Sequence, residues 1–241
     1  MPKTSGPSRL PQWSFALGRG RETQRWVGTE PPPVVSLGPV RRVRSHAHGR
    51  GVPTWAFSVT MGCHLRLESG VEHDLLRWLD QEGDVDHLLP QPAQIHYEGP
   101  RARVLTHTPD VLSVQQDGVV TVWDARPTEK QDDGFLAAAE ATRQACRELG
   151  WEYKVFSGIP TLLRVNLLWL DGFRSPQPWY ASAWSTIAPT AGAAITIGEV
   201  LAADGGQGYV LSAMWHQIRH RRLQCDLESP LSAATRLTAV P

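Results

Sequence analysis

The chain has 241 residues, enough for one medium domain and a small one, and its 41% apolar and 20% charged content is ordinary for a globular protein. No apolar run is close to the length of a membrane span, which is about 20 residues. The first 30 residues lack the apolar core of a signal peptide. The cysteines Cys63, Cys146 and Cys225 are odd in number and in no metal-binding spacing. They therefore favour a reducing cytoplasm and argue against structural disulfides.

The formal net charge of zero hides an asymmetry along the chain. Residues 1–54 carry nine Lys or Arg and two acids, residues 55–158 carry nine bases and seventeen acids, and residues 159–241 are nearly balanced. A basic arm beside an acidic body suits a protein that touches phosphates through the arm and holds a metal in the body. A solubilising tail that binds nothing is the other interpretation of the arm.

Residues 1–40 are rich in Pro, Gly, Ser and Arg, and we expect them to form a disordered arm. The composition becomes globular from about residue 41. Ser69 is typical of a helix N-cap, and apolar residues at helical spacing predict a helix as far as Asp80. The elements expected after it are strands over 94–97, 103–115 and 119–124, a helix from Asp132 or Asp133 to Leu149, and a strand over 152–156.

This order predicts residues 41–158 to be an α/β core with an antiparallel meander, in which a mixed sheet is flanked by helices. In residues 159–241 we expect helices over 162–170, 197–203 and 209–222, followed by a hairpin of strands over 223–227 and 235–239. Helix, turn, helix and hairpin is the order of a winged-helix domain.

Three carboxylates stand at positions that suit a metal site. Glu72 lies on the first turn of a predicted helix, Asp110 opens a strand and Asp124 ends the next strand. Hydrolysis of a phosphodiester needs an oriented water and neutralisation of the transition-state charge, and Mg²⁺ held by carboxylates supplies both. Oxygen ligands suit Mg²⁺, or Mn²⁺ in its place, whereas the scattered His and Cys do not form a zinc site.

The hairpin loop decides whether two of these carboxylates meet. A two-residue loop at Asp117-Gly118 places Asp110 opposite Ala125 and turns Asp124 to the other face. A three-residue loop that begins at Gln116, with Gly118 in the left-handed conformation, places Asp110 opposite Asp124. Only the second loop builds a metal site.

Each residue also has a structural interpretation. Ser69-x-x-Glu72 is a capping box, in which the glutamate binds the Ser69 backbone N–H. In the structural interpretation, Asp110 is an ordinary polar residue at a strand edge. Asp124 and Arg126 then form a simple surface ion pair. Alternation along the strand places His107 on the face opposite Asp110, which favours a structural role for the histidine.

The residues together form an ordered set: Glu68-Ser69-x-x-Glu72, Leu79-Asp80, Val85, Gln91-Pro92, His107-Thr108-Pro109-Asp110, Asp117-Gly118, Val122 and Asp124-x-Arg126-Pro127. This set resembles the PD-(D/E)xK nuclease superfamily, and more closely the TnsA-type endonuclease subunit of heteromeric transposases. The resemblance covers residues 41–158, and residues 159–241 more loosely. It implies a restriction-endonuclease-like core and Mg²⁺-dependent cutting of DNA at the 5′ ends of a mobile element.

The resemblance also implies roles for residues. Glu72, Asp110 and Asp124 would be catalytic metal ligands, the Ala125 carbonyl would be a further ligand, and Gln91 would support the site. Arg126 would be catalytic where the family has lysine. Arginine stays protonated, so it can stabilise transition-state charge but cannot act as a base. Lys130 and Lys154 are the alternative sources of a lysine in the site.

The implied partners are transposon-end DNA, a DDE-type transposase subunit that cuts the 3′ ends, and an AAA+ ATPase regulator. In the last predicted helix, Arg219, Arg221 and Arg222 are candidates for contacts with DNA phosphates; a basic surface that docks a protein partner is the other interpretation. Three functions remain open at this point. They are a metal-dependent endonuclease subunit, a catalytically inactive subunit that bridges transposase, regulator and DNA, and a stand-alone winged-helix regulator.

Overall fold

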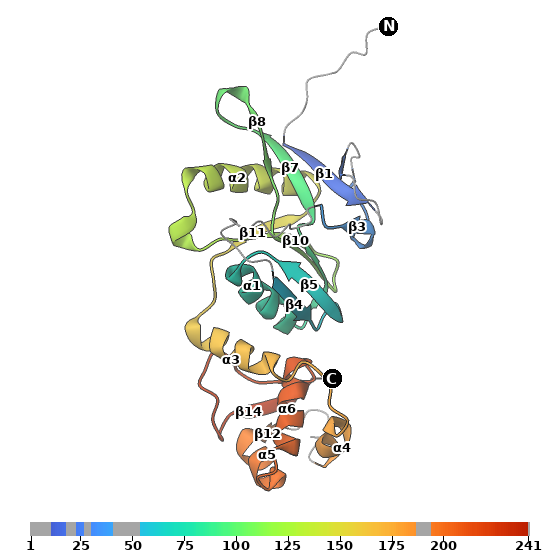
Figure 1. Cartoon of the computed structure of the whole chain (residues 1–241), viewed down its shortest axis with the longest axis vertical. Coiled ribbons are helices and arrows are strands. Elements are labelled where there is room, and N and C mark those ends of the chain that lie inside the picture. The colour runs from blue at the N-terminus through green and yellow to red at the C-terminus, as the bar shows by residue number, and fades with distance from the viewer. Residues whose placement is uncertain (1–10, 18–22, 27–29, 41–53, 187–193, 241) are drawn as a thin grey trace. The chain divides into compact units, whose positions relative to one another are not determined.

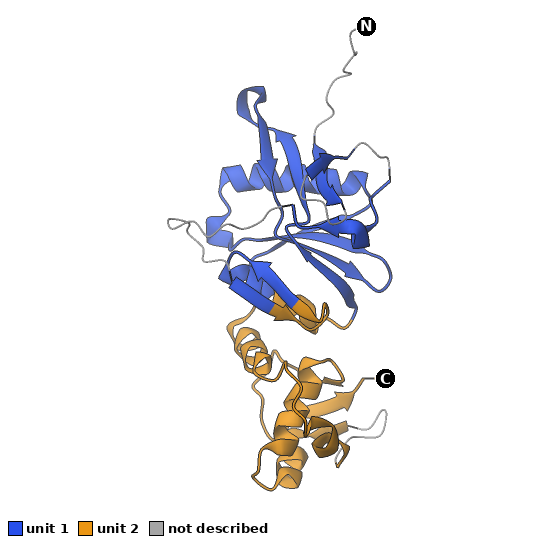
Figure 2. Cartoon of the chain, turned by 45° about the vertical axis from the view of Figure 1, so that its right-hand side comes forward, with its two compact units in different colours: residues 1–56, 64–75, 84–158 blue, residues 57–63, 76–83, 159–241 orange. Residues whose placement is uncertain are grey.

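The structure, a computed structural model, describes residues 11–17, 23–26, 30–40, 54–186 and 194–240. It is a mixed α/β fold in which several sheets are flanked by helices (Figure 1). Among the residues it describes, no helix is long and apolar enough to cross a membrane. The chain divides into two compact units (Figure 2), of which the first holds residues 1–56, 64–75 and 84–158 and the second holds residues 57–63, 76–83 and 159–241.

The first sheet of the first unit has the strand order β2-β1-β7-β8, and β3 also pairs with β1. All of these pairs are antiparallel. The strands are β1 (Gln12–Leu17), β2 (Thr23–Arg25), β3 (Leu37–Gly38), β7 (Ala93–Glu98) and β8 (Val104–His107).

The strand β1 corrects the expectation that residues 1–40 form a disordered arm. Trp13 and Phe15 are buried in the core, and the Trp13 indole Nε1 donates a hydrogen bond to the Ala145 carbonyl at 3.1 Å. Their alternation sends both rings to one face, where burial of large aromatic surface stabilises the strand although its flanks are rich in Pro, Gly and Arg. Residues 1–10 of the expected arm lie outside the described residues.

The second sheet has the order β11-β10-β9-β6. Its strands are β6 (Val85–Pro90), β9 (Val111–Gln115), β10 (Val120–Ala125) and β11 (Glu152–Phe156). β10 and β11 are parallel, and the helix α2 (Asp133–Glu148) makes the crossover between them. The Asp132 carboxylate caps this helix by accepting the Phe135 N–H at 2.8 Å, as the sequence predicts.

One core joins the two sheets to α2. Its buried members are Trp13, Phe15, Leu37, Leu89, Ala93, Ile95, Leu112, Val122, Ala145, Cys146, Leu149 and Trp151. The region 103–115, which the sequence predicts as strand, is therefore two strands in different sheets: β8 belongs to the first and β9 to the second. The chain passes between them at Thr108, Pro109 and Asp110, where proline has no N–H to offer to a ladder.

A two-stranded hairpin precedes the first helix. It is built from β4 (Thr54–Ser58) and β5 (Cys63–Leu67), and the helix is α1 (Gly70–Gln81). Residues 70–75 of α1 belong to the first unit and residues 76–81 to the second. Three short 3-10 helices complete the first unit: η1 (Val34–Ser36), η2 (Pro100–Ala102) and η3 (Thr128–Lys130).

The C-terminal part of the second unit contains helices and a small sheet with the order β12-β14-β13. Its elements are α3 (Thr161–Asp171), α4 (Tyr180–Ser185), β12 (Ala194–Thr196), α5 (Ile197–Asp204), α6 (Tyr209–Arg219), β13 (Leu223–Gln224) and β14 (Arg236–Ala239). Thr196 and Glu199 form a capping box at the start of α5. The last helix ends at Arg219 instead of residue 222, and Arg221 adopts a positive φ of 59°.

Candidate functional site

The hairpin between β9 and β10 has the loop that a shared site requires. Val111 pairs with Trp123, and the Gln115 N–H donates to the Val119 carbonyl at 2.9 Å, so the loop consists of residues 116–118. Gly118 has a φ of 87°, which a glycine adopts at little cost. The three-residue loop is therefore confirmed, and continuing the register by one position places Asp110 opposite Asp124.

Asp110 lies at the centre of a group of acidic residues. Its Oδ2 accepts the Ala125 N–H at 2.7 Å, which fixes the carboxylate at the end of the hairpin. Burial raises the pKa of the Asp110 carboxyl well above its ordinary value; the negative charges of Glu72 and Asp124 raise this pKa further, and that of Glu68 adds less. Four carboxylates from three separate parts of the chain thus act on one another and favour a proton or a cation among them.

Glu72 is buried on the first turn of α1. Its N–H donates to the Ser69 Oγ at 3.2 Å, and its Oε2 accepts the Glu68 N–H at 2.9 Å. The helix start therefore has half of the capping box expected from the sequence, because the glutamate binds the N–H one residue before the cap. This bond fixes one carboxylate oxygen of Glu72 beside Glu68.

Asp124 is 2% exposed and accepts hydrogen bonds at both oxygens. The His107 Nε2 lies 3.0 Å from Oδ1 and 2.9 Å from Oδ2, and the Tyr153 hydroxyl donates to Oδ2 at 2.5 Å. Burial raises the pKa of the Tyr153 hydroxyl, and the charge of Asp124 raises it further. Asp124 is thus held by two side chains in the position where the sequence predicts a metal ligand.

The contact with His107 is one that sequence reasoning missed. Strand alternation placed His107 on the face opposite Asp110, but alternation applies only within one continuous strand. The chain changes sheets between β8 and β9, so the rule does not reach across residues 108–110. The signal that was available is the Thr108-Pro109 pair, since proline ends a ladder.

Gln91 is joined to Asp110 by a backbone hydrogen bond. It has a φ of 43°, and its N–H donates to the Asp110 carbonyl at 2.8 Å. Its side-chain Nε2 is buried and has no hydrogen-bond partner among the described residues. A buried amide without a partner is costly, so it suits a position that completes its bonds with a ligand or water.

Arg126 makes its contacts at the start of α2. Its Nε donates to the Lys130 carbonyl at 2.8 Å, and its guanidinium lies 3.9 Å from the Asp132 carboxylate and 5.5 Å from the Phe135 ring centre. None of these partners is a carboxylate of the acidic group around Asp110. Arg126 is therefore directed to η3 and the start of α2 in this structure, with a long surface contact to Asp132.

Neither Lys130 nor Lys154 contacts the acidic group. Lys154 pairs with Glu152 at 2.7 Å and lies over the Trp123 ring at 5.6 Å. It stands opposite Trp123 in the parallel pair of β10 and β11, whereas Asp124 is the next residue and points to the other face of the sheet. For Lys130, the contact with Arg126 is made by the backbone carbonyl.

The fit to a divalent cation is partial. The donor type and the charge suit Mg²⁺, since the acidic group offers carboxylate oxygens and Gln91 offers a buried amide. Within the described part of the chain, however, no three His, Cys, Asp or Glu side chains are arranged so that they hold a metal ion. Two carboxylates keep hydrogen bonds instead: Asp124 to His107 and Tyr153, and Glu72 to the Glu68 N–H.

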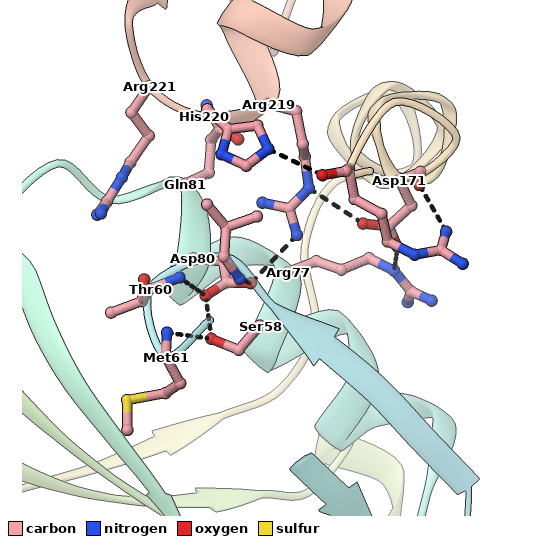
Figure 3. A network of polar contacts seen from close by, with 12 residues as sticks. Ser58, Thr60, Met61, Arg77, Asp80, Gln81, Asp171, Arg219, His220 and Arg221 are labelled. Atoms are coloured by element: carbon pink, nitrogen blue, oxygen red, sulfur yellow. Dashed lines mark hydrogen bonds and ion pairs between the residues drawn. The ribbon is translucent and has the colours of Figure 1, made fainter. Parts of the chain in front are cut away.

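Arg219, predicted to contact DNA, is instead part of a buried network in the second unit (Figure 3). Its side chain is 3% exposed; Nη2 lies 3.1 Å from Asp80 Oδ2 and Nε lies 3.2 Å from Asp171 Oδ1. Arg77 binds the other Asp171 oxygen at 2.6 Å. The Arg219 guanidinium is therefore not open to a DNA phosphate in this structure, because its Nη2 and Nε are directed to the carboxylates of Asp80 and Asp171.

The other two arginines differ from Arg219. The Nη1 of Arg221 donates to the Glu82 carbonyl at 2.6 Å and its side chain is partly buried, whereas Arg222 is exposed. His216 and His220 also bind backbone carbonyls, at Phe173 and Arg174. Of the basic residues at the end of α6, Arg222 is the one whose side chain is open to a phosphate.

Comparison with known protein families and with curated proteins gives no match for this sequence.

Proposed function

We propose that the chain is a Mg²⁺-dependent DNA endonuclease subunit of a heteromeric transposase, cutting at the 5′ ends of a mobile element. The observation that carries this proposal is the acidic group around Asp110, in which Glu72 and Asp124 raise the pKa of a third carboxyl. Like charges held close enough to shift a pKa would be stabilised by a cation between them.

Further support comes from the order of elements. In the first unit, Asp110 and Asp124 lie at the end of the β9–β10 hairpin, and β10 is followed by the crossover helix α2 and the parallel strand β11. In the second unit the order α5, α6, β13 and β14, with β14 between β12 and β13, is that expected of a winged helix. The restriction-endonuclease-like core and the winged helix are parts of the proposal.

In the proposed reaction, bound Mg²⁺ would polarise the phosphodiester and make a bound water more acidic. Asp110, Glu72 and Asp124 would hold the ion. The Ala125 N–H keeps the Asp110 carboxylate in place. Gln91 would use its buried amide to orient a ligand or water in the same place.

The partners in this proposal are transposon-end DNA, a DDE-type transposase subunit and an AAA+ ATPase regulator. They follow from the resemblance of the motifs to TnsA-type subunits. The DNA contacts of the second unit would be made by the exposed Arg222, which follows α6, with Arg219 excluded by its burial.

Cutting of transposon-end DNA tests the proposal. The full chain is mixed with the transposase subunit and a labelled end, and nicks are counted with Mg²⁺, with Mn²⁺ and with EDTA. We expect nicks at the 5′ end with either metal, and their loss in Asp110→Asn. Glu129→Gln is the matched control, because Glu129 is an exposed acid outside the group and its loss changes the net charge equally.

A second function, a catalytically inactive subunit that bridges transposase, regulator and DNA, is favoured by a specific observation. Asp124 is bound at both oxygens by other side chains, and Arg126 is directed to the start of α2. Calorimetric titration with Mn²⁺ separates the two functions. Binding that is lost in Asp110→Asn supports the nuclease, whereas assembly with the transposase without Mn²⁺ binding or nicking supports the bridging subunit.

A further inference from the structure

The hairpin of β4 and β5 exposes an aromatic side chain beside a cation. Trp55 on β4 is 64% exposed, far more than a tryptophan in a core. The Arg66 guanidinium on β5 lies 6.0 Å from the centre of the Trp55 ring. Arg66 forms no ion pair with a carboxylate of the described residues, so its charge is not neutralised within this part of the chain.

The stretch of sequence from residue 31 to residue 67, which contains the hairpin, has charges of one sign. Between Glu30 and Glu68 there is no acidic residue, and this stretch contains five arginines, Arg41, Arg42, Arg44, Arg50 and Arg66. Residues 41–53 lie outside the described residues, but their charge is fixed by the sequence. An exposed aromatic ring in an acid-free, arginine-rich stretch complements a polyanion that carries flat rings.

We propose that the β4–β5 hairpin is a contact surface for an unpaired DNA strand, with a base stacked on Trp55 and a phosphate bound by Arg66. A base inside a duplex has both faces covered by its neighbours, whereas an unpaired base has a face free for an aromatic side chain. The Arg66 guanidinium next to the indole places a positive charge where the phosphate of a stacked nucleotide lies. The surface thus selects frayed or distorted DNA ends.

The role of this surface in cutting rests on the proposed nuclease function. The surface would hold the unpaired DNA strand close to the acidic group. β5 leads directly into Glu68, whose charge raises the pKa of Asp110 and whose N–H binds Glu72. Glu68 follows Arg66 by two positions, about 7 Å along an extended chain. At about 3.4 Å per nucleotide of a stacked strand, a phosphate at Arg66 lies about two nucleotides from the acidic group.

The test measures binding in EDTA, where no metal-dependent cutting occurs, so it is independent of nuclease activity. Fluorescence anisotropy of the full chain is recorded with two labelled DNAs, a blunt duplex and the same duplex with an unpaired 5′ end. For Trp55→Ala we expect about tenfold weaker binding of the unpaired end, since stacking of one base is worth about one such factor. Trp55→Phe should retain most of the affinity, because a phenyl ring also stacks.

Arg66→Gln tests the phosphate contact. It should weaken binding and lower the slope of log affinity against log salt by about 0.7 to 1, as expected for one lost phosphate contact. Trp169→Ala and Arg103→Gln are the matched controls: Trp169 is 53% exposed on α3, and Arg103 is an exposed arginine of the first unit. Both should bind the unpaired end as the unchanged chain does.

Several outcomes would overturn the inference. If Trp55→Ala and Arg66→Gln bind the unpaired end with unchanged affinity, the hairpin is not a DNA contact surface. If these variants lose binding of a partner protein but keep DNA binding, the hairpin is a protein contact surface. Equal losses on the two DNAs reject the preference for an unpaired strand. If Asp110→Asn leaves cutting unchanged while Trp55→Ala still weakens binding, the proposed metal site fails and the DNA surface stands.

Discussion

Replacing Asp80 by asparagine tests the buried network of the second unit. Asp80 is fully buried, and its two oxygens accept four hydrogen bonds. Oδ1 accepts from the Ser58 Oγ at 2.7 Å and the Thr60 N–H at 3.2 Å, and Oδ2 accepts from the Val59 N–H at 2.9 Å and the Arg219 Nη2 at 3.1 Å.

Asparagine has nearly the same shape as aspartate but presents one oxygen and one NH₂ group. Whichever side the NH₂ group takes, it faces at least one backbone N–H, either that of Val59 or that of Thr60. One unsatisfied buried donor costs about 1–3 kcal/mol. Arg219 also loses its more deeply buried counter-charge, so the total approaches the about 3–5 kcal/mol typical of breaking a buried ion pair.

The measurement is urea unfolding of the full chain followed by tryptophan fluorescence and circular dichroism, with the transition of the second unit fitted separately where two transitions appear. Asp86→Asn is the matched control, since Asp86 is an exposed aspartate on β6 and should change stability by less than about 0.5 kcal/mol. A loss below about 1 kcal/mol for Asp80→Asn would refute the argument that Arg219 depends on Asp80.

The other predictions concern Asp110 and β1. The folded-state pKa of Asp110 lies above its unfolded value, so its protonated form favours folding; this contribution is complete below about pH 4 and is lost as pH rises through the folded pKa. Without metal, the melting temperature should fall with rising pH in that window, and Asp110→Asn should flatten the fall; an unchanged pH profile contradicts the assignment. Phe15→Ala should cost about 3–5 kcal/mol in urea unfolding, because the ring is fully buried. A loss of unfolding free energy under about 1 kcal/mol would instead indicate that β1 is part of a disordered arm.

Local patterns in the sequence predicted much of the first unit. The cap, expected at Asp132 or Asp133, and the strand over 152–156 depend on neighbours a few residues apart, and both are present. For the loop at Gly118 the sequence left two lengths open, and the structure has the three-residue loop. The loop in turn sets the register that places Asp110 opposite Asp124. The mixed α/β class follows from the same order of helices and strands.

The features that the sequence did not predict share a different cause, since each depends on a partner distant in the chain. Phe15 is buried through pairing of β1 with β7, about eighty positions away, which the composition of residues 1–40 does not reveal. Arg219 has the pattern of a surface cation, but its partner Asp80 precedes it by 139 residues. His107 reaches Asp124 because the chain changes sheets between them.

The make-up of the second unit decides how the protein can be divided for experiments. Trp78 packs against the core of α3, α5 and α6, and Asp80 supplies the charge that Arg219 requires, yet both are encoded far ahead of residue 159. A fragment that begins at residue 159 would carry an uncovered apolar surface and a half-neutralised guanidinium. Truncation there would yield an aggregating product, and weak DNA or partner binding by such a fragment would reflect the missing residues 57–63 and 76–83.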